Sequence, residues 1–524
     1  TEVVLASYID SGLDCVKKFN GMWAFCIYDI EKQILFLSRD RLGQKPLYYY
    51  WDGKDFIFSS ELKGILNFNI PKIINQDGFD LYLSLGMIPA PYSIFKNVYK
   101  LEPRKNLIFD IKKKKITELS YYKLPKYQPN KKIKILIDEG KKLLKDATQL
   151  RLIADVPIGA FLSGGLDSSA TVATMSNFLE LKNLHTFSIG FGGSYDETKY
   201  SNIIKDFFNT IHHYKFFNKN DFERLLKTIF YFYDEPFADH SIFPTMAVSK
   251  LASDFVTVVL TGDGGDEIFG GYDKYQAAAQ MAILRKIPKF IRKLGYRLIP
   301  KPLASSISTF KYLKEGIKIS LKPPEDYFTE LWSEEVYKPE IYKQWTQEKL
   351  KQCLELSNGN FTEALIKYDY YFFTMAENFL FKVDKASMAH SIETRSPFLD
   401  YRFIDYSTKI PVEMKTNYKM RKILMREIIK DLVPEEIVKR GKKGFEPPII
   451  EWIMKEEYLK EIKKRINELH NREILNDNWK NFYDRICVKR KISLIDTWYL
   501  VRMFLFGRWV DQWFSNSYKT KGFV

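Results

Sequence analysis

The chain has 524 residues, of which 45% are hydrophobic, and its formal net charge is +16. This length predicts two or more domains, and the hydrophobic share is ample for their cores. No window of about eighteen uncharged apolar residues occurs, so the sequence contains no candidate for a membrane-spanning helix. The four cysteines lack CxxC spacing, so neither a disulfide framework nor a zinc site is indicated, and the reducing cytoplasm is the default expectation.

The N-terminal residues 1–118 are rich in predicted β-strands. Apolar and aromatic runs at 47–51 and 56–60 flank Asp52-Gly53, a dipeptide that is typical of a hairpin turn. The residues that follow, 119–133, contain two prolines and are expected to form a linker.

Residues 134–524 are expected to form the second domain. Apolar strands alternate with helical segments in its first part, and helices dominate beyond Ala277. The predicted strands are 156–162, 184–189, 212–216 and 256–260. This alternation predicts an α/β fold with a parallel sheet that helices cover on both faces.

A glycine- and serine-rich turn, SGGLDSS at 163–169, joins the first of these strands to a helix predicted over 170–181. Gly164 and Gly165 allow the backbone to turn and bring its N–H groups close to a ligand, and the start of the helix attracts an anion. No Gly-Lys-Ser/Thr follows, so this is not the common nucleotide P-loop. Because Asp167 would repel a bare anion, the turn predicts a magnesium-bound pyrophosphate group. The alternative is a chance glycine–serine turn.

A second glycine-rich turn, TGDGGDE at 261–267, follows the strand predicted at 256–260. Ligands gather at the carboxyl ends of the strands of a parallel sheet, so both turns are expected at one edge. Asp167 and Asp266 could then share a Mg²⁺ ion, which takes carboxylate and phosphate oxygens. A solvated acidic turn is the alternative, and the presence of the first turn disfavours it.

Three further segments place charged residues in apolar or glycine-rich surroundings: 234–245, 383–400 and 440–445. Taken singly, the first two are more typical of structural salt-bridge networks. In the third, Lys442 lies beside two glycines, where a flexible lysine could reach a phosphate and stabilise charge that develops in a transition state. A lysine in a basic run more often faces solvent.

Together these motifs closely resemble the glutamine-dependent asparagine synthetase family, from the first residues to about Trp452. The resemblance is specific in SGGLDSS, TGDGGDE, DEPFAD, the VDKASM and ETRSPFLD pair, and KRGKKGF. It implies an adenine-nucleotide α-hydrolase-like parallel α/β domain with a helical C-terminal part. It also implies that this domain binds ATP with Mg²⁺ and converts aspartate to β-aspartyl-AMP, from which ammonia gives asparagine, AMP and pyrophosphate.

The resemblance assigns a role to each matching residue. Asp263 and Lys442 would help to form and stabilise β-aspartyl-AMP, and Asp167 and Asp266 would bind Mg²⁺. The residues that would line the adenosine site are Leu162, Ile189, Thr261 and Gly262. Those that would hold the pyrophosphate part of ATP are Ser163, Gly164, Gly165, Leu166, Asp167, Ser168 and Ser169.

Segments 19–25, 38–48 and 59–63 resemble the second half of the family's glutaminase domain, which implies an αββα N-terminal-nucleophile fold. That domain normally begins with a catalytic cysteine, whose own α-amino group is the base, and the sequence does not begin with one. Thr1 is an alternative nucleophile, but its segment aligns with an interior helix. We therefore interpret residues 1–118 as the C-terminal part of a truncated glutaminase. We expect its full-length parent, and not this fragment, to hydrolyse glutamine.

Three alternatives stay open. A family relative with the same motifs could amidate another carboxylate, such as a surface-polysaccharide precursor. A tRNA-modifying pyrophosphate-loop ATPase is suggested by the net charge of +16, but the paired catalytic cysteines that it would need are absent from the sequence. A non-catalytic regulatory remnant is the third alternative, and the presence of Asp167, Asp266 and Lys442 counts against it. The expected partners are ATP, aspartate and ammonia or glutamine; we expect no membrane, disfavour nucleic acid and leave a homodimer open.

Overall fold

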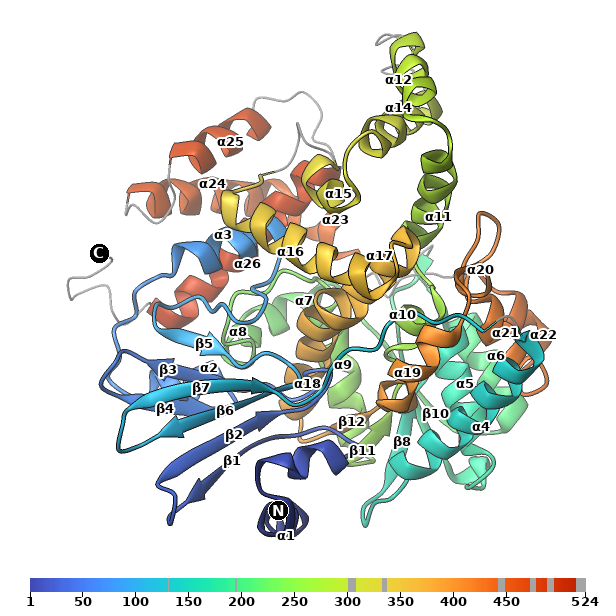
Figure 1. Cartoon of the computed structure of the whole chain (residues 1–524), viewed down its shortest axis with the longest axis horizontal. Helices are drawn as coiled ribbons and strands as arrows, with labels where there is room; N and C mark the ends of the chain where they lie inside the picture. Colours follow the sequence, from blue (N-terminus) through green and yellow to red (C-terminus); the bar gives the residue numbers. More distant parts are fainter. Residues whose placement is uncertain are drawn as a thin grey trace.

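Strands dominate the N-terminal part of the chain and form two antiparallel sheets. The computed structural model describes residues 1–130, 132–193, 196–299, 308–331, 337–441, 448–471, 477–487 and 494–514. Figure 1 shows the two sheets beside a third, parallel sheet. The four-stranded sheet has the order β1-β2-β6-β7 and the three-stranded sheet the order β4-β3-β5. Their strands are β1 (Ala24–Asp29), β2 (Ile34–Arg39), β3 (Tyr48–Trp51), β4 (Phe56–Ser59), β5 (Val98–Lys100), β6 (Lys105–Asp110) and β7 (Lys115–Ser120). The helices of this part are α1 (Glu2–Ser11), η1 (Gly12–Lys18), α2 (Leu62–Leu66) and α3 (Gln76–Leu85).

The hairpin predicted around Asp52-Gly53 is confirmed, because β3 and β4 pair across it. The Asp52 carboxylate accepts hydrogen bonds from the N–H groups of Lys54 (2.9 Å) and Asp55 (2.8 Å). Gly53 has a φ of +92°, which glycine adopts without a steric cost. Aromatic rings join the two antiparallel sheets: Phe56 of β4 stacks on Phe109 of β6 with ring centres 4.3 Å apart.

The five strands of the parallel sheet have the order β10-β9-β8-β11-β12. They are β8 (Ile158–Phe161), β9 (His185–Gly190), β10 (Ile211–Phe216), β11 (Val258–Leu260) and β12 (Glu393–Arg395). The four predicted strands are confirmed, although β8 and β11 are shorter than the apolar runs that contain them. The sequence did not indicate β12, because this short strand carries two charges and joins the sheet only by pairing with β11.

Helices cover both faces of the parallel sheet, as the alternation predicts. Val258 and Leu260 of β11 belong to one hydrophobic core, which includes residues of α4 and α5. Val259 belongs to another core, with Phe243 and Met246 of α9. The helices of this part are α4 (Ile133–Arg151), α5 (Leu166–Met175), η2 (Leu181–Asn183), α6 (Thr198–Phe208), α7 (Lys219–Leu226), α8 (Ile229–Phe232) and α9 (Ile242–Ser253). Regular structure overlaps both ends of the predicted linker, since β7 extends to Ser120 and α4 begins at Ile133.

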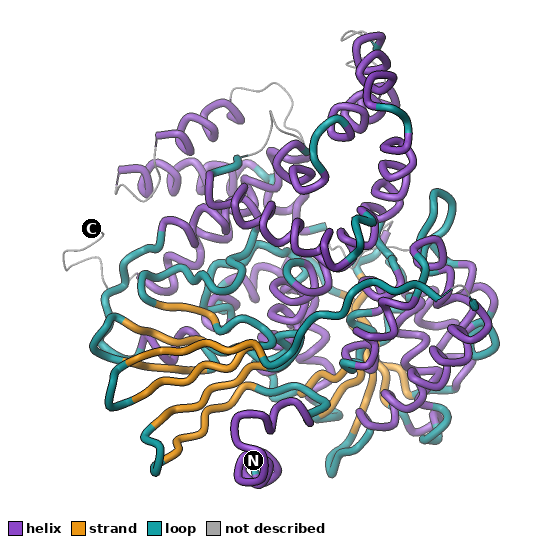
Figure 2. The backbone as a smooth tube through the Cα atoms, viewed as in Figure 1, coloured by secondary structure: helices purple, strands orange, loops and turns teal. Residues whose placement is uncertain are grey.

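Helices predominate in the rest of the described chain, and Figure 2 shows them around and above the sheets. They are α10 (Gly265–Phe269), α11 (Asp273–Lys286), α12 (Lys289–Leu298), α14 (Ser308–Ser320), η4 (Pro324–Asp326), α15 (Tyr327–Glu330), α16 (Glu340–Leu356), α17 (Phe361–Tyr371), η5 (Thr374–Phe379), α18 (Leu380–Met388), η6 (Pro397–Leu399), α19 (Arg402–Lys409), α20 (Val412–Lys415), α21 (Ile423–Ile429), α22 (Glu435–Lys439), α23 (Ile449–Ile453), α24 (Glu456–Asn471), α25 (Asp477–Cys487) and α26 (Leu494–Phe514). Of the helices described, none has the length and apolar character needed to cross a membrane.

Helix α26, near the end of the described chain, packs against the N-terminal part. Arg502 donates hydrogen bonds to the carbonyl groups of Leu83 (2.6 Å) and Ser84 (2.9 Å) in α3. Trp509 donates from Nε1 to the carbonyl group of Asp234 at 2.9 Å. One helix thus joins the N-terminal part to the segment that follows α8.

Ion pairs also connect the two halves of the chain, and one of their members, Lys385, is buried. Lys385 Nζ is 2.9 Å from Asp234 and 3.1 Å from Glu61, and Lys45 Nζ is 2.7 Å from Asp384. Burial alone would lower the pKa of Lys385, but Asp234 and Glu61 offset it and raise that pKa above its ordinary value. The salt-bridge interpretation of the two charged segments is therefore confirmed for these members.

Replacement of Lys385 by methionine should destabilise the protein by about 3 kcal/mol, because it leaves the Asp234 carboxylate buried without its cation. The thermal midpoint of unfolding measures this loss. The control is Lys250→Met, which removes a solvent-exposed pair with Asp254 and should cost less than about 1 kcal/mol. Equal decreases of the thermal midpoint in the two variants would show that the buried pair stabilises the protein no more than the exposed pair does.

Candidate active site

A cavity of about 650 Å³ opens at the carboxyl ends of β8, β9 and β11. Most of the residues assigned from the sequence line it: Leu162, Ser163, Gly165, Leu166, Asp167, Ser168, Ile189, Thr261, Gly262, Asp263 and Asp266. Gly164 and Ser169 are not among its lining residues. Lys442 lies in 442–447, outside the described residues.

Glycine and serine shape the turn after β8. Gly164 has a φ of +68°, and a Cβ atom there would overlap the backbone of Tyr200. The Ser163 hydroxyl oxygen accepts a hydrogen bond from the N–H of Gly165 at 3.2 Å and lies 3.1 Å from the hydroxyl oxygen of Ser168. Gly164 therefore shapes the turn from behind, while the serine side chains line the cavity.

Helix α5 begins at Leu166, earlier than the helix predicted over 170–181. Asp167 and Ser168 consequently lie in its first turn, where backbone N–H groups favour an anion. Ser169 is fully buried and donates its N–H to the carbonyl group of Gly165 at 3.0 Å. Its place in the helix explains why it supports the turn without reaching the cavity.

The turn after β11 packs directly against the first turn. A Cβ atom on Gly262 would lie 2.7 Å from the backbone nitrogen of Ser168 and 2.8 Å from Cβ of Asp167. Any side chain there would push the turns apart, so glycine permits the close approach. The Thr261 hydroxyl donates a hydrogen bond to the Asp263 carboxylate at 2.7 Å, which orients that carboxylate beside the cavity.

The ammonium group of Lys422 lies between the two turns. Its Nζ is 2.5 Å from Oδ2 of Asp167 and 2.5 Å from Oδ1 of Asp266, and the residue is only 4% exposed. Lys422 precedes α21 with a φ of +54°, an uncommon conformation for a residue with a side chain and one that concentrates at functional sites. The sequence predicts a cation between these carboxylates but does not identify this lysine. The sequence indicates such a group only indirectly, because two carboxylates that lie close together require a positive charge beside them.

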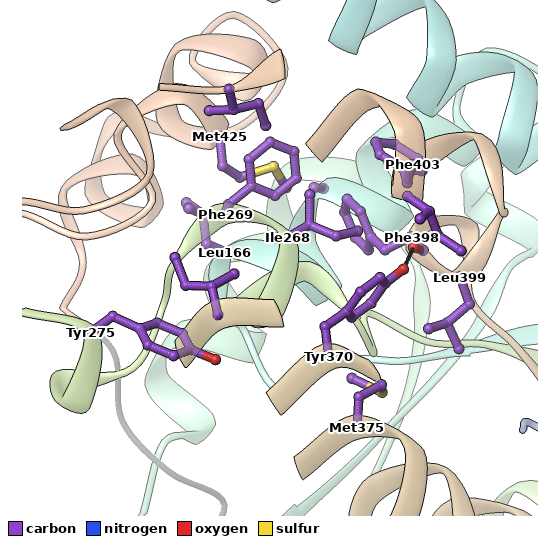
Figure 3. Packing of buried hydrophobic residues seen from close by; sticks show 14 of the residues in the cluster. Leu166, Ile268, Phe269, Tyr275, Tyr370, Met375, Phe398, Leu399, Phe403 and Met425 are labelled. Carbon is purple, nitrogen blue, oxygen red and sulfur yellow. Dashed lines mark hydrogen bonds between the residues drawn. The ribbon is translucent and has the colours of Figure 1, made fainter. Parts of the chain in front are cut away.

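Apolar packing beneath the turns fixes their separation. Figure 3 shows Leu166 of α5 and Ile268 and Phe269 of α10 among the side chains of one hydrophobic cluster. The ring of Phe269 meets that of Phe398 edge-on, with centres 6.2 Å apart, and Tyr370 donates a hydrogen bond to the carbonyl group of Phe398 at 3.4 Å. Because α5 and α10 both begin in the glycine turns, this core holds the acidic side chains in place.

An ion pair lines another part of the cavity. Lys382 Nζ is 2.9 Å from Asp239 and donates a hydrogen bond to the Ser241 hydroxyl at 2.7 Å. It also lies 4.2 Å from the centre of the Phe379 ring, which belongs to the π-helical turn η5. Burial alone would raise the pKa of Asp239, but Lys382, His240 and Ser241 lower it below the ordinary range. Asp239 lies in the charged segment 234–245 that the sequence singles out, whereas Lys382 directly precedes the segment 383–400, so the sequence assigned no role to the pair.

Glu267 follows Asp266 in α10 and also lines the cavity. Burial, and then the neighbouring Asp266 carboxylate, raise the pKa of Glu267 to about 8. Its carboxyl group accepts a hydrogen bond from the Tyr272 hydroxyl at 2.5 Å. The raised pKa favours the neutral form of Glu267, which carries no negative charge next to Asp266.

Arg440 lies at the turn after β8. Its guanidinium group is 4.0 Å from the centre of the Tyr200 ring, forms an ion pair with Glu197, and donates a hydrogen bond to the carbonyl group of Ser163 at 3.4 Å. The chain therefore reaches the glycine turn just before residues 442–447. The sequence alone gives Arg440 no role, because both of its side-chain partners lie on a distant part of the chain.

The sequence matches two known protein families. Residues 139–490 match the asparagine synthase family, and residues 1–122 match the glutamine amidotransferase domain. Over 391 residues, 74% of this chain and 76% of the relative, the sequence is 54% identical to putative asparagine synthetase [glutamine-hydrolyzing] 2 of Methanocaldococcus jannaschii. It is 30% identical over 476 residues to asparagine synthetase [glutamine-hydrolyzing] 1 of Bacillus subtilis (87% and 72% covered). It is 25% identical over 501 residues to amidase chry2 of Gibberella zeae (86% and 73% covered).

A double-mutant cycle should detect the bridge made by Lys422. Lys422→Met alone should lower the thermal midpoint, because it removes the cation between two carboxylates, and Asp266→Asn introduced with it should restore part of the loss. We expect a coupling of about 1–3 kcal/mol. Strictly additive effects of the two substitutions on unfolding would contradict this bridge.

Proposed function

Because the chain belongs to the asparagine synthetase family, whose members use ATP, we propose that it amidates aspartate to asparagine through β-aspartyl-AMP. The nucleophile at the cavity is ammonia. For the full-length parent, glutamine is proposed as the source of that ammonia, because residues 1–122 match the glutamine amidotransferase domain.

The convergence of two glycine turns and Lys422 at one edge of the parallel sheet carries the proposal. The turn at 163–169 offers backbone N–H groups, hydroxyl groups and the start of α5, which together suit a pyrophosphate group. The turn at 261–267 brings further carboxylates, in addition to that of Asp167, to the same cavity. A site built in this way suits a phosphate anion whose charge is balanced by a cation.

In the proposed reaction, a carboxylate oxygen of aspartate attacks the α-phosphorus of ATP. The bond to the β-phosphate breaks, and pyrophosphate leaves. Ammonia then attacks the acyl carbon and loses a proton, and AMP departs with the carboxylate oxygen that it acquired. Asp263 and Lys442 are proposed to help form and stabilise the intermediate between these steps, and Leu162, Ile189, Thr261 and Gly262 to hold the adenosine.

Mg²⁺ is proposed to bind with ATP at Asp167 and Asp266. The two carboxylates converge on one point, where the Lys422 ammonium supplies positive charge, and such a donor set also suits a divalent cation. Within the described residues, no group of three or more histidine, cysteine, aspartate and glutamate side chains is placed to hold a metal. The remaining ligands would then be phosphate oxygens and water, as is usual for Mg²⁺. When bound, the ion would neutralise charge on the leaving pyrophosphate.

The ion pair of Asp239 and Lys382 supports an amino acid as the acceptor. A zwitterionic amino acid presents an ammonium and a carboxylate, and this part of the cavity offers one partner of each sign. A sugar acid has no ammonium group, so the Asp239 carboxylate would have no positively charged partner on that substrate.

The proposal is tested by release of pyrophosphate from ATP with ammonium and a panel of carboxylic acids. We expect aspartate to give equal amounts of AMP and pyrophosphate, and Asp167→Asn to abolish both products while the circular dichroism spectrum stays unchanged. Turnover with a sugar acid but not with aspartate would replace aspartate as the substrate. Near-normal turnover of Asp167→Asn would remove Asp167 from the catalytic set.

Lys442→Ala should lower the rate of asparagine formation by about two to three orders of magnitude, as expected for the loss of one positioned charge that acts in the transition state. ATP binding should weaken much less. Lys443→Ala is the matched control, since it removes the adjacent charge of the same loop. A mild Lys442→Ala with a damaging Lys443→Ala would show that the assignment within this loop is wrong by one residue.

A further inference from the structure

Helices α12 and α14 form a hairpin that projects from the body of the protein, away from both antiparallel sheets and the parallel sheet (Figure 1). It lies within 275–351, a lysine- and aromatic-rich part of the sequence to which the proposed amidation gives no role. Helix α11, which begins at the cavity-lining residue Asp273, leads to it.

One face of α12 packs on α14. A Cβ atom on Gly295 would lie 3.9 Å from Cδ1 of Ile317 in α14. Lys314 of α14 donates a hydrogen bond to the carbonyl group of Ile299 at 2.6 Å, and its Nζ lies 5.2 Å from the centre of the Tyr296 ring. Gly295 and Tyr296 therefore mark the inward face of α12.

The opposite face of α12 is apolar and exposed. Phe290 is 73% exposed, Leu294 56% and Leu298 70%, and Ile291 beside them is 46% exposed. With 3.6 residues per turn, these four side chains fall within an arc of about 100°. No residue of α12 is buried. A contiguous apolar stripe of this kind marks an interaction surface.

Basic side chains flank this stripe. Lys289, Lys293 and Arg297 are exposed and follow the adjacent face of α12. No acidic residue occurs from Arg285 through Arg297. The helix thus combines an apolar stripe with a row of positive charge, and both are exposed to solvent.

We propose that this hairpin binds the surface of an anionic lipid bilayer. An amphipathic helix with basic residues beside an aromatic and aliphatic stripe lies in the interface, with the stripe among the acyl chains and the charges among the headgroups. The stripe projects from the molecule, so it can enter a flat interface without a complementary groove. A nucleic acid would use the basic row but leave the stripe uncovered. A helix that crosses a bilayer and a helix that lies on its surface are different modes of membrane association. The absence of a candidate for the first therefore does not conflict with the second.

Flotation of the full chain with lipid vesicles tests the proposal. Vesicles of equimolar phosphatidylcholine and phosphatidylglycerol should bind the protein, pure phosphatidylcholine vesicles should bind it at least about tenfold more weakly, and added salt should reduce binding. Phe290→Glu with Leu294→Glu should weaken binding by about tenfold or more, as should Lys289→Glu with Lys293→Glu.

Two matched controls change equally exposed residues elsewhere. Ile153→Glu with Phe207→Glu replaces side chains that are 71% and 57% exposed, and Lys112→Glu with Lys115→Glu makes the same change of charge. Both controls should bind vesicles like the wild type. All variants should keep the wild-type thermal midpoint, because each change lies on the surface.

Three outcomes would overturn the proposal. The first is failure of the wild type to bind the anionic vesicles, or equal binding to both vesicle types. The second is an equal loss of binding in the hairpin variants and the controls. The third is that the Phe290 and Leu294 substitutions disrupt a dimer in light scattering, or abolish binding to tRNA, while vesicle binding is unchanged.

Discussion

The arrangement of the site depends on the ion pairs that the Lys422 ammonium group forms with Asp167 and Asp266. Asp167 and Asp266 follow neighbouring parallel strands, β8 and β11, so the sheet itself brings two negative charges together. Lys422 lies 2.5 Å from both and balances them. Glycine at position 262 allows the two turns to touch, and the core around Phe269 keeps them there. Charge balance and close packing thus act on the same few residues.

The two halves of the chain are joined by the segments that also line the cavity. Lys385 and Lys382 lie one turn apart on α18: the first pairs with Asp234 beside Glu61 of the N-terminal part, and the second pairs with Asp239 in the cavity. Helix α26 contributes Arg502 to the cavity lining while it packs on α3. We therefore expect a substitution at this junction to alter the cavity as well, because side chains of α18 form both contacts.

Local patterns in the sequence predict the parts of the structure that local forces determine. The hairpin at Asp52-Gly53 and the four apolar strands of the parallel sheet were predicted, because turn chemistry and apolar runs act over a few residues. The start of α5 was placed too late, since Asp167 and Ser168 read as loop and not as a first helical turn. Strand β12, Lys422 and Arg440 could not be predicted in the same way, because each takes its place through partners far along the chain. The role of Lys442 stays a prediction.

The proposed amidation depends most directly on the attack of a carboxylate on the α-phosphorus of ATP at this cavity. Aspartate labelled with ¹⁸O at both oxygens of its β-carboxylate is incubated with the protein, ATP and ammonium, and mass spectrometry of the products measures this step. This mechanism predicts that each AMP formed carries one labelled oxygen and that the pyrophosphate carries none. Label in pyrophosphate or inorganic phosphate, or ADP in place of AMP, would contradict it.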